Sequence, residues 1–460
     1  MERNTFNGFI DEFPTTKKKY SFHFDGEKVN LNPLTPNDRM IFGGRHLPVD
    51  FCPARYTSGG TVAFYNCGVE EVGIFSGSGE IRLHPTYYFY SRAVNVQADS
   101  FDRIQFTGEL VNLVFPPIQK VEYDSDNPSD NPLWFTKEYD GSKTIKTKPF
   151  AQVDKSFVVS IDGVICTCRF GVFSPGSITE KDSNLGELKS YFSIEFHSSQ
   201  SLEKLKTVYL IVRKFFQFLL NRQEIWFNEI VISNRNKNGK YENNGYFVDL
   251  KVQPDTPPKS CSQFSCFEPH VDKLFELISR EDINFNYITK NSKEAKYVTQ
   301  EQYVTCCGAF EYNYNQFYTS DESNDAFKYE TIEKIKNFLG EIDTLKKEER
   351  KYYAHIVDVL EKDINSVEAC FNRCRKKYAC AVDEYILRIS QNRNVNKSTN
   401  FGSHFSSFRN EKAHGELTPF THEAVCAYLI GIVLIECMLL DHCGYTKSEI
   451  KTIVEQRYIR

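Results

Sequence analysis

The 460-residue sequence lacks the features that mark secreted and membrane proteins. Its first twenty residues are polar and contain no apolar segment of the kind found in a signal peptide. The most apolar run, residues 424–440, is interrupted by Glu436 and is short for a membrane span. The composition is that of an ordinary water-soluble protein with a net charge of −5. We therefore expect a cytoplasmic protein with no membrane segment.

Metal-site and nucleotide-loop patterns are also missing. The 14 cysteines never form paired C-x2-C units with histidines at ligand spacing, which argues against a zinc site. Cys370, Cys374, Cys426 and Cys437 lie at helical spacing among apolar residues, as small buried side chains do. The glycines around Gly77 lack the Lys-Ser/Thr of a phosphate-binding loop. From these absences we expect the protein to bind no metal ion and no cofactor.

The length suggests two or three domains, and residues 1–257 have the pattern of a β-rich domain. Asp162-Gly163 predicts a hairpin turn, and residues 201–220 predict a helix with Ser201 as its N-cap. The Pro-rich stretch at 255–258 marks the domain edge. Short runs of β-branched and aromatic residues predict strands at 61–65, 79–89, 103–110, 157–166, 191–196 and 246–250.

The remainder of the chain predicts helices. A helical connector is expected over residues 258–295, followed by a helical domain over residues 296–460. This domain is expected to be a bundle of about six helices. Its helical segments are predicted at 301–318, 328–345, 348–364, 367–389, 405–413, 420–440 and 448–457. The expected fold is thus an α+β multidomain protein, with a β-rich N-terminal domain and an all-α helical bundle.

One stretch near the C-terminus carries residues suited to phosphodiester chemistry. Arg409 and His414 lie five positions apart, which on a straight helix would point them about 140° away from each other. Gly415 and Pro419 break the pattern just beyond the histidine, so His414 can turn back toward Arg409. A permanent cation can hold a phosphate while an imidazole moves protons.

Two other Arg–His pairs with similar spacing show that the spacing alone does not identify a catalytic site. Arg350 and His355 lie inside an uninterrupted helical pattern, where the two side chains diverge. The pair at 39 and 46 lies in a glycine-containing loop. The 409–414 pair alone combines an adjacent Asn410, a helix break and a strongly apolar helix immediately afterwards.

That motif, Arg409-Asn410-x3-His414, resembles the signature of the HEPN superfamily, Arg-x4–6-His with a polar residue after the arginine. The segments 202–222 and 225–230 resemble the N-terminal domain of ApeA-type proteins, in which a β-rich domain precedes a C-terminal HEPN domain. The resemblance implies a bacterial anti-phage protein that acts by abortive infection. It also implies an unidentified phage-derived trigger.

For the site, the resemblance implies metal-independent RNA cleavage at a composite centre made by two HEPN domains, hence a homodimer. His414 would transfer a proton or orient the RNA 2′-OH, and Arg409 would stabilise charge on the phosphate. Asn410 would hold one of the two in place. Some HEPN families add an acidic residue on the first helix, and Glu311 is the candidate here, with a solvated surface glutamate as the alternative.

RNA contact would need a local basic patch, because acidic and basic residues nearly balance in residues 296–460. The candidates cluster on one predicted helix: Arg373, Arg375, Lys376 and Lys377. They are equally compatible with a solvated helix face. Two other functions remain open. One is a non-catalytic HEPN module that binds RNA or a protein partner, and the other is a carbohydrate- or protein-binding β domain with a helical oligomerisation tail.

Overall fold

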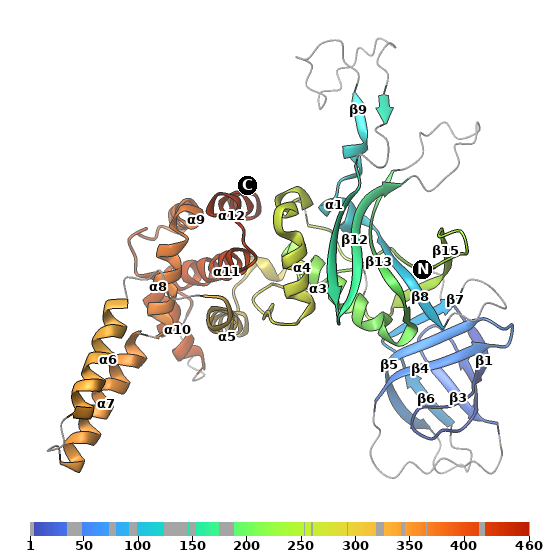
Figure 1. The fold of residues 1–460 in the computed structure, drawn as a ribbon, viewed down its shortest axis with the longest axis horizontal. Helices are drawn as coiled ribbons and strands as arrows, with labels where there is room; N and C mark the ends of the chain where they lie inside the picture. The colour runs from blue at the N-terminus through green and yellow to red at the C-terminus, as the bar shows by residue number, and fades with distance from the viewer. Residues whose placement is uncertain are drawn as a thin grey trace. The chain divides into compact units, whose positions relative to one another are not determined.

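The chain forms two compact units, one rich in strands and one helical (Figure 1). The computed structural model describes residues 4–34, 48–72, 80–91, 99–123, 145–147, 153–173, 188–252, 254–258, 261–291, 293–318, 326–341, 346–364, 366–413 and 419–459. The β unit comprises Met1–Phe216 and Glu224–Lys259, and the helical unit comprises Gln217–Gln223 and Ser260–Arg460. This organisation confirms the predicted α+β multidomain class. Segment 217–223 groups with the helical unit, whereas the predicted first domain ran unbroken to residue 257.

Six strands of the β unit close into a small barrel. They pair in the order β5-β4-β1-β2-β3-β6, and β6 pairs back onto β5. Alternate side chains point inward, so aromatic and aliphatic residues such as Phe22, Phe64 and Leu83 fill the interior. The strands are β1 (Phe6–Ile10), β2 (Tyr20–Phe24), β3 (Val29–Pro33), β4 (Val49–Tyr56), β5 (Thr61–Val72) and β6 (Glu80–His84).

The sheet continues beyond the barrel through β7, which pairs with β5, in the order β7-β15-β14-β8-β13-β12-β11. One face of this part is covered by α3 (Leu205–Leu220), whose Phe215 and Phe216 contact Phe170 and Phe192 at ring-centroid distances of 5.7–6.5 Å. The additional strands are β7 (Tyr87–Ser91), β8 (Ser100–Thr107), β11 (Lys155–Ile161), β12 (Val164–Phe173), β13 (Lys189–Ser201), β14 (Glu229–Arg235) and β15 (Tyr241–Asp249). A separate ribbon consists of β9 (Val121–Tyr123) and β10 (Ile145–Thr147).

The predicted hairpin at Asp162-Gly163 is confirmed. Ile161 pairs with Val164 across the two-residue turn. Asp162 and Gly163 both have positive φ angles, 49° and 78°, as a turn that follows the right-handed twist of the strands requires.

Two local predictions in this unit are wrong in detail. The strand predicted over 103–110 lies three residues earlier, as β8 (Ser100–Thr107), because α1 (Glu109–Val114) begins within the predicted range. Gly108 has a φ angle of 145°, and a Cβ atom there would lie only 2.7 Å from the side chain of Asn228. This position therefore requires glycine, and the chain leaves the strand there. Ser201 lies at the N-cap of the turn before α3, but its side chain makes no capping hydrogen bond.

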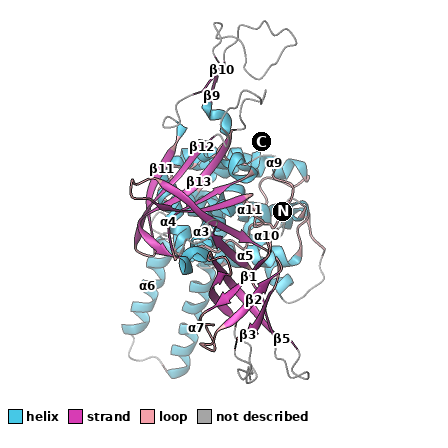
Figure 2. Ribbon diagram, turned by 90° about the vertical axis from the view of Figure 1, so that its right-hand side faces the viewer, coloured by secondary structure: helices cyan, strands magenta, loops and turns pink. Residues whose placement is uncertain are grey.

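The helical unit has more α-helices than the seven segments that the sequence predicts over residues 296–460. The part described between 296 and 460 contains eight α-helices, and α4 (Val271–Ser279) lies in the predicted connector. Figure 2 shows α6 and α7 side by side. Ile332 of α6 and Val357 of α7 form a small buried core. The eight are α5 (Gln300–Phe317), α6 (Ala326–Glu341), α7 (Lys347–Ile364), α8 (Val367–Lys377), α9 (Ala379–Asn392), α10 (Phe401–Ala413), α11 (His422–His442) and α12 (Lys447–Val454). A π-helical turn, Glu455–Ile459, follows α12.

The single helix predicted over 367–389 is in fact two helices, α8 and α9, which meet at Tyr378. Tyr378 departs from helical geometry, with φ −102° and ψ 20°. Its ring is buried, and its hydroxyl donates a 2.8 Å hydrogen bond to Asp441 Oδ2 of α11. No glycine or proline marks this break, so the hydrophobic stripe alone could not predict it.

Helix α11 is the central helix of the helical unit. All residues from Ile430 to Leu440 are buried, and Thr421 caps the helix by accepting a hydrogen bond from the N–H of Ala424. Its length and composition would allow it to cross a membrane, but 83% of its most apolar window is buried inside the protein. The central helix of a water-soluble bundle has the same properties.

A buried ion pair crosses this apolar core. Arg457, in the last turn of the chain, donates a 2.7 Å hydrogen bond to Glu436 of α11, and both side chains are almost fully buried. Arg457 also donates to the backbone oxygens of Phe218 and Leu219 at 2.8 and 3.2 Å. Burial alone lowers the pKa of this guanidinium, but the Glu436 carboxylate raises it above its ordinary value, so the arginine stays charged. The pair ties the chain's end to residues 218–219 and to α11.

Most of the cysteines behave as buried apolar residues: eleven of the 14 are buried, whereas Cys380 is exposed and Cys261 and Cys266 are partly exposed. Cys370, Cys374, Cys426 and Cys437 are all buried, as predicted, and each of the 14 cysteines is a free thiol. Burial raises the pKa of thiols in this core, for example that of Cys443 to about 12. Such thiols are largely protonated at neutral pH and are poor nucleophiles.

Replacing Arg457 with methionine should lower the free energy of unfolding by about 3–5 kcal/mol at pH 7.5, because Glu436 is then buried without a cation. The pKa of Glu436 would lie well above its value in the unfolded chain. The variant's stability should therefore rise as the pH falls toward 5 and the carboxyl takes up a proton. Urea unfolding of the purified chain at pH 5.0 and 7.5 measures this.

The matched control is the double variant Glu436→Gln/Arg457→Met, which carries neither charge. It should be more stable than Arg457→Met at pH 7.5, and the two should converge at pH 5.0. An equal difference between them at both pH values would contradict the prediction.

Candidate functional site

The candidate site lies where α5 and α10 pack together in the helical unit. Phe401, Phe405 and Phe408 of α10 are buried and recur at i, i+4 and i+7, so they form one face of the helix. Tyr303 of α5 lies against Phe405 and Phe408 with ring-centroid distances of 5.9 and 4.9 Å. A Cβ atom at Gly431 of α11 would lie 2.7 Å from the ring of Phe405, so a larger residue there would push α10 away. This packing fixes α10 against α5 and α11.

The packing brings Arg409 of α10 next to Glu311 of α5, 98 residues earlier in the sequence. The Nη2 atom of Arg409 donates to both carboxylate oxygens of Glu311, at 2.8 and 3.2 Å. Each side chain is about one third exposed, 35% for Arg409 and 34% for Glu311. The pair is thus accessible to a ligand. Two of the residues selected from the sequence are direct partners in the structure.

Asn410 is a second partner of the same guanidinium. Arg409 Nη1 donates a 3.2 Å hydrogen bond to Asn410 Oδ1, and Asn410 is exposed. A guanidinium has five N–H donors. These contacts leave the Nε–H and one Nη1–H without a partner among the residues that the structure describes. Glu311 and Asn410 therefore orient the arginine and leave it able to bind an anion. His414 lies outside the described residues.

Burial perturbs several groups beneath the pair. It raises the pKa of the Cys307 thiol, with the Arg409 cation acting in the opposite direction and Glu311 adding to the increase. It also raises the pKa of the Tyr303 phenol. Both groups are therefore neutral at physiological pH and are structural rather than acid–base residues. Glu411 was not selected from the sequence, yet its Oε2 is buried and has no hydrogen-bond partner within the described ranges.

Two of the predicted RNA-binding cations are already engaged, one by α5 and one by α11. Arg373 donates a 3.0 Å hydrogen bond from Nε to the hydroxyl of Tyr314. Lys377 forms a 2.9 Å ion pair with Asp441, and its side chain is only 13% exposed. Tyr314 lies on α5, three positions after Glu311. Of the four predicted RNA contacts, Arg373 is thus the one that binds the helix carrying Glu311. The Asp441 carboxylate neutralises Lys377 and makes it the weaker candidate.

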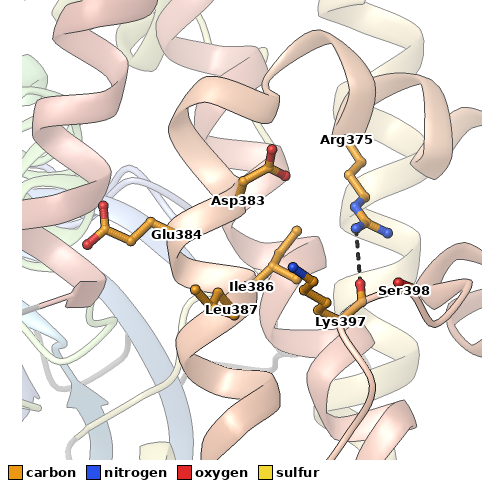
Figure 3. A pocket seen from close by; sticks show the side chains of 7 residues that line it. All are labelled: Arg375, Asp383, Glu384, Ile386, Leu387, Lys397 and Ser398. Carbon is orange, nitrogen blue, oxygen red and sulfur yellow. Dashed lines mark hydrogen bonds between the residues drawn. The ribbon is translucent and has the colours of Figure 1, made fainter.

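The other two cations lie on other sides of α8. Lys376 is exposed. Arg375 donates to the backbone oxygens of Lys397 and Thr399 at 3.4 and 3.5 Å and lies at the rim of a pocket (Figure 3). The structure therefore does not bring the four basic residues together as one face, because adjacent helix positions point about 100° apart.

The other Arg–His pair, Arg350 and His355, lies in an uninterrupted helix, as predicted. That helix is α7, and both residues are exposed. Five positions apart in this straight helix, the two side chains point away from each other. The pair at 39 and 46 lies outside the described residues.

The described residues contain no group of three or more His, Cys, Asp or Glu side chains that could hold a metal ion. The donor set at the candidate site is one guanidinium, one carboxylate and one amide, which suits an anion rather than a cation. Comparison of the chain with protein-family profiles, curated proteins and solved structures finds no match.

Removing the Arg409–Glu311 pair should leave the fold intact. Arg409→Ala and Glu311→Ala should each lower the free energy of unfolding by no more than about 1 kcal/mol, because a pair this exposed contributes little to stability. A double-mutant cycle in urea should give a coupling energy of about 0.2–1 kcal/mol. Arg350→Ala serves as the surface control. A loss above about 3 kcal/mol would show that the pair is part of the core.

Proposed function

We propose that this chain is an endoribonuclease of the HEPN type, which cleaves RNA without a metal ion. The observation that carries the proposal is the Glu311–Arg409–Asn410 cluster. The Arg-x4-His motif selects Arg409 and Asn410 from the sequence alone, and the fold adds a carboxylate from a distant helix that orients the guanidinium. A partly exposed arginine that is held in place and still has N–H donors available can bind a phosphodiester.

The reaction would be attack of an RNA 2′-OH on the adjacent phosphate. One proton leaves the 2′-OH and one reaches the departing 5′-oxygen. His414 would carry out the proton transfer or orient the 2′-OH. Arg409 would stabilise the charge that develops on the phosphate oxygens, a contribution of about 2–4 kcal/mol to the barrier by analogy with other oxyanion donors. Glu311 and Asn410 would act as positioning residues that hold the guanidinium toward the phosphate.

The wider setting follows from the ApeA resemblance. The protein would be a cytoplasmic bacterial anti-phage protein, with the β unit responding to a phage-derived trigger and restraining the helical unit. Once released, it would cut cellular RNA, with transfer RNA as one candidate substrate, and cause abortive infection. One Arg–His pair is a sparse catalytic set, so we propose a homodimer in which two helical units share one cleft.

A non-catalytic RNA-binding or interaction module is the second candidate. The Arg409–Glu311 ion pair favours this second function, because Glu311 neutralises the charge of Arg409 and an ion pair can have a purely structural role. The two functions differ in whether purified protein cleaves RNA. They also differ in whether cleavage depends on Arg409 and His414.

Arg409→Ala and His414→Ala should each abolish RNA cleavage and protection against phage while the protein stays folded. The reason is that one residue binds the phosphate and the other moves the protons. RNA end-mapping in bacteria that express each variant provides the measurement. Arg350→Ala and His355→Ala are the matched controls and should keep full activity. Full ribonuclease activity in either site variant would exclude the catalytic assignment.

Cleavage should persist in EDTA and leave a 2′,3′-cyclic phosphate or 3′-phosphate together with a 5′-OH. A two-metal mechanism needs a cluster of carboxylates that the site does not offer. A heterodimer of wild-type chain with His414→Ala should lose more than half of the activity, since both copies contribute to one cleft. Independent sites would lose half. Products with 5′-phosphates, strict Mg²⁺ dependence or full activity in a monomer would contradict this mechanism.

A further inference from the structure

A pocket of about 480 Å³ opens in the helical unit between α8, α9 and the loop that leads into α10 (Figure 3). Its size lies within the range of small-molecule sites, about 300–1,000 Å³. Neither Arg409 nor Glu311 lines it, so the candidate cleavage site does not account for it. The lining residues are Arg375, Asp383, Glu384, Ile386, Leu387, Lys397 and Ser398.

Two cations lie on the loop side of the pocket. The Arg375 guanidinium is fixed by its hydrogen bonds to the oxygens of Lys397 and Thr399, and it lies 5.6 Å from the ring centroid of Phe401. The loop is held by an Asx turn, in which Asn396 Oδ1 accepts a 2.9 Å hydrogen bond from the N–H of Ser398. Lys397 is exposed, and in Figure 3 its ammonium group points toward Ile386. This side of the pocket is therefore rigid and positively charged.

The opposite side is formed by α9 and has a different character. Asp383 and Glu384 are exposed carboxylates on successive positions of the helix. Figure 3 shows Asp383 pointing toward the side on which Arg375 lies. Next to them, Ile386 is buried and Leu387 is 41% exposed, so an aliphatic surface faces the pocket. The pocket lining thus combines cations, carboxylates and an apolar patch.

We propose that this pocket binds one nucleotide unit, a phosphate with its ribose and base. Arg375 and Lys397 would hold the phosphate, since guanidinium and ammonium groups are its usual protein partners. The carboxylate of Asp383 would accept hydrogen bonds from ribose hydroxyls, as acidic residues do in dinucleotide sites. The base would lie on Leu387. A bare anion would meet repulsion from the Asp383 carboxylate, and a metal ion would meet repulsion from the two cations.

The nucleotide can come from two sources, a free mononucleotide or one residue of an RNA strand. The proposal does not depend on cleavage at Arg409. The experiment therefore measures binding. Isothermal titration of the full chain is carried out with AMP, GMP, CMP and UMP, with 2′-deoxy-AMP, and with inorganic phosphate. A five-nucleotide single-stranded RNA is titrated separately into the His414→Ala chain, so that the strand stays intact.

At least one ribonucleotide should bind with a Kd below about 1 mM, and both Lys397→Met and Asp383→Asn should weaken it at least tenfold. Both residues are exposed, so the variants should keep the melting temperature of the wild type. Arg375 is left unchanged, because it also braces the loop. Arg388→Met, an exposed cation on α9 outside the pocket lining, is the control and should bind normally. The 2′-deoxy ligand should bind more weakly than AMP.

Binding of AMP assigns the pocket to free nucleotides, and binding of the pentamer alone, with the same sensitivity to Lys397→Met, assigns it to RNA. Three results would overturn the proposal. These are no binding of any mononucleotide or of the pentamer, binding that neither pocket variant weakens, and competition by inorganic phosphate as strong as that by AMP. The last result would leave only an anion site. None of these outcomes bears on whether RNA is cleaved at Arg409.

Discussion

The helical unit depends on the complete burial of α11. A helix that is apolar on every side cannot face water, so other helices must surround it. Here α5, α10, α8, α9 and α12 all contact it. Surrounding α11 forces α5 and α10 to lie next to each other, with Phe405 seated over Gly431. Glu311 and Arg409 meet for this reason. The candidate site is thus a consequence of how one apolar helix is covered.

A second constraint acts inside the same core. Glu436 is the charged residue in the buried run of α11, and a buried carboxylate is unfavourable without a cation. Arg457 supplies the cation from the chain's last turn and also binds the backbone of residues 218–219. An apolar pair could fill this space with equal or greater stability. The ion pair instead specifies one position for the C-terminal segment, because only that position satisfies both charges.

The charge distribution constrains how RNA would be bound. The helical unit has no excess of basic residues. Three of the four basic residues of α8 bind different partners, namely Tyr314, Asp441 and the loop before α10, and the fourth, Lys376, is exposed. Contact with RNA would therefore be local, through Arg409 with Arg373 nearby, rather than through a broad field. Weak long-range attraction would suit the proposed ribonuclease, which would stay inactive until a signal arrives. The pocket at Arg375 offers a separate place for a nucleotide.

Sequence patterns alone determined the α+β class, most of the helices, the Asp162-Gly163 turn and the burial of Cys370, Cys374, Cys426 and Cys437. They located β5 to β8, β11 to β13 and β15, but not β1 to β4, β9, β10 or β14. The features that the patterns did determine all depend on local periodicity or on turn chemistry. The Arg-x4-His motif selected Arg409 and Asn410 as candidates, and the resemblance to HEPN families selected Glu311. Only the tertiary structure decided that Glu311 and Arg409 touch, because their contact depends on packing between helices far apart in sequence. It also decided the break at Tyr378, where a side-chain hydrogen bond to α11 outweighs a continuous helical pattern.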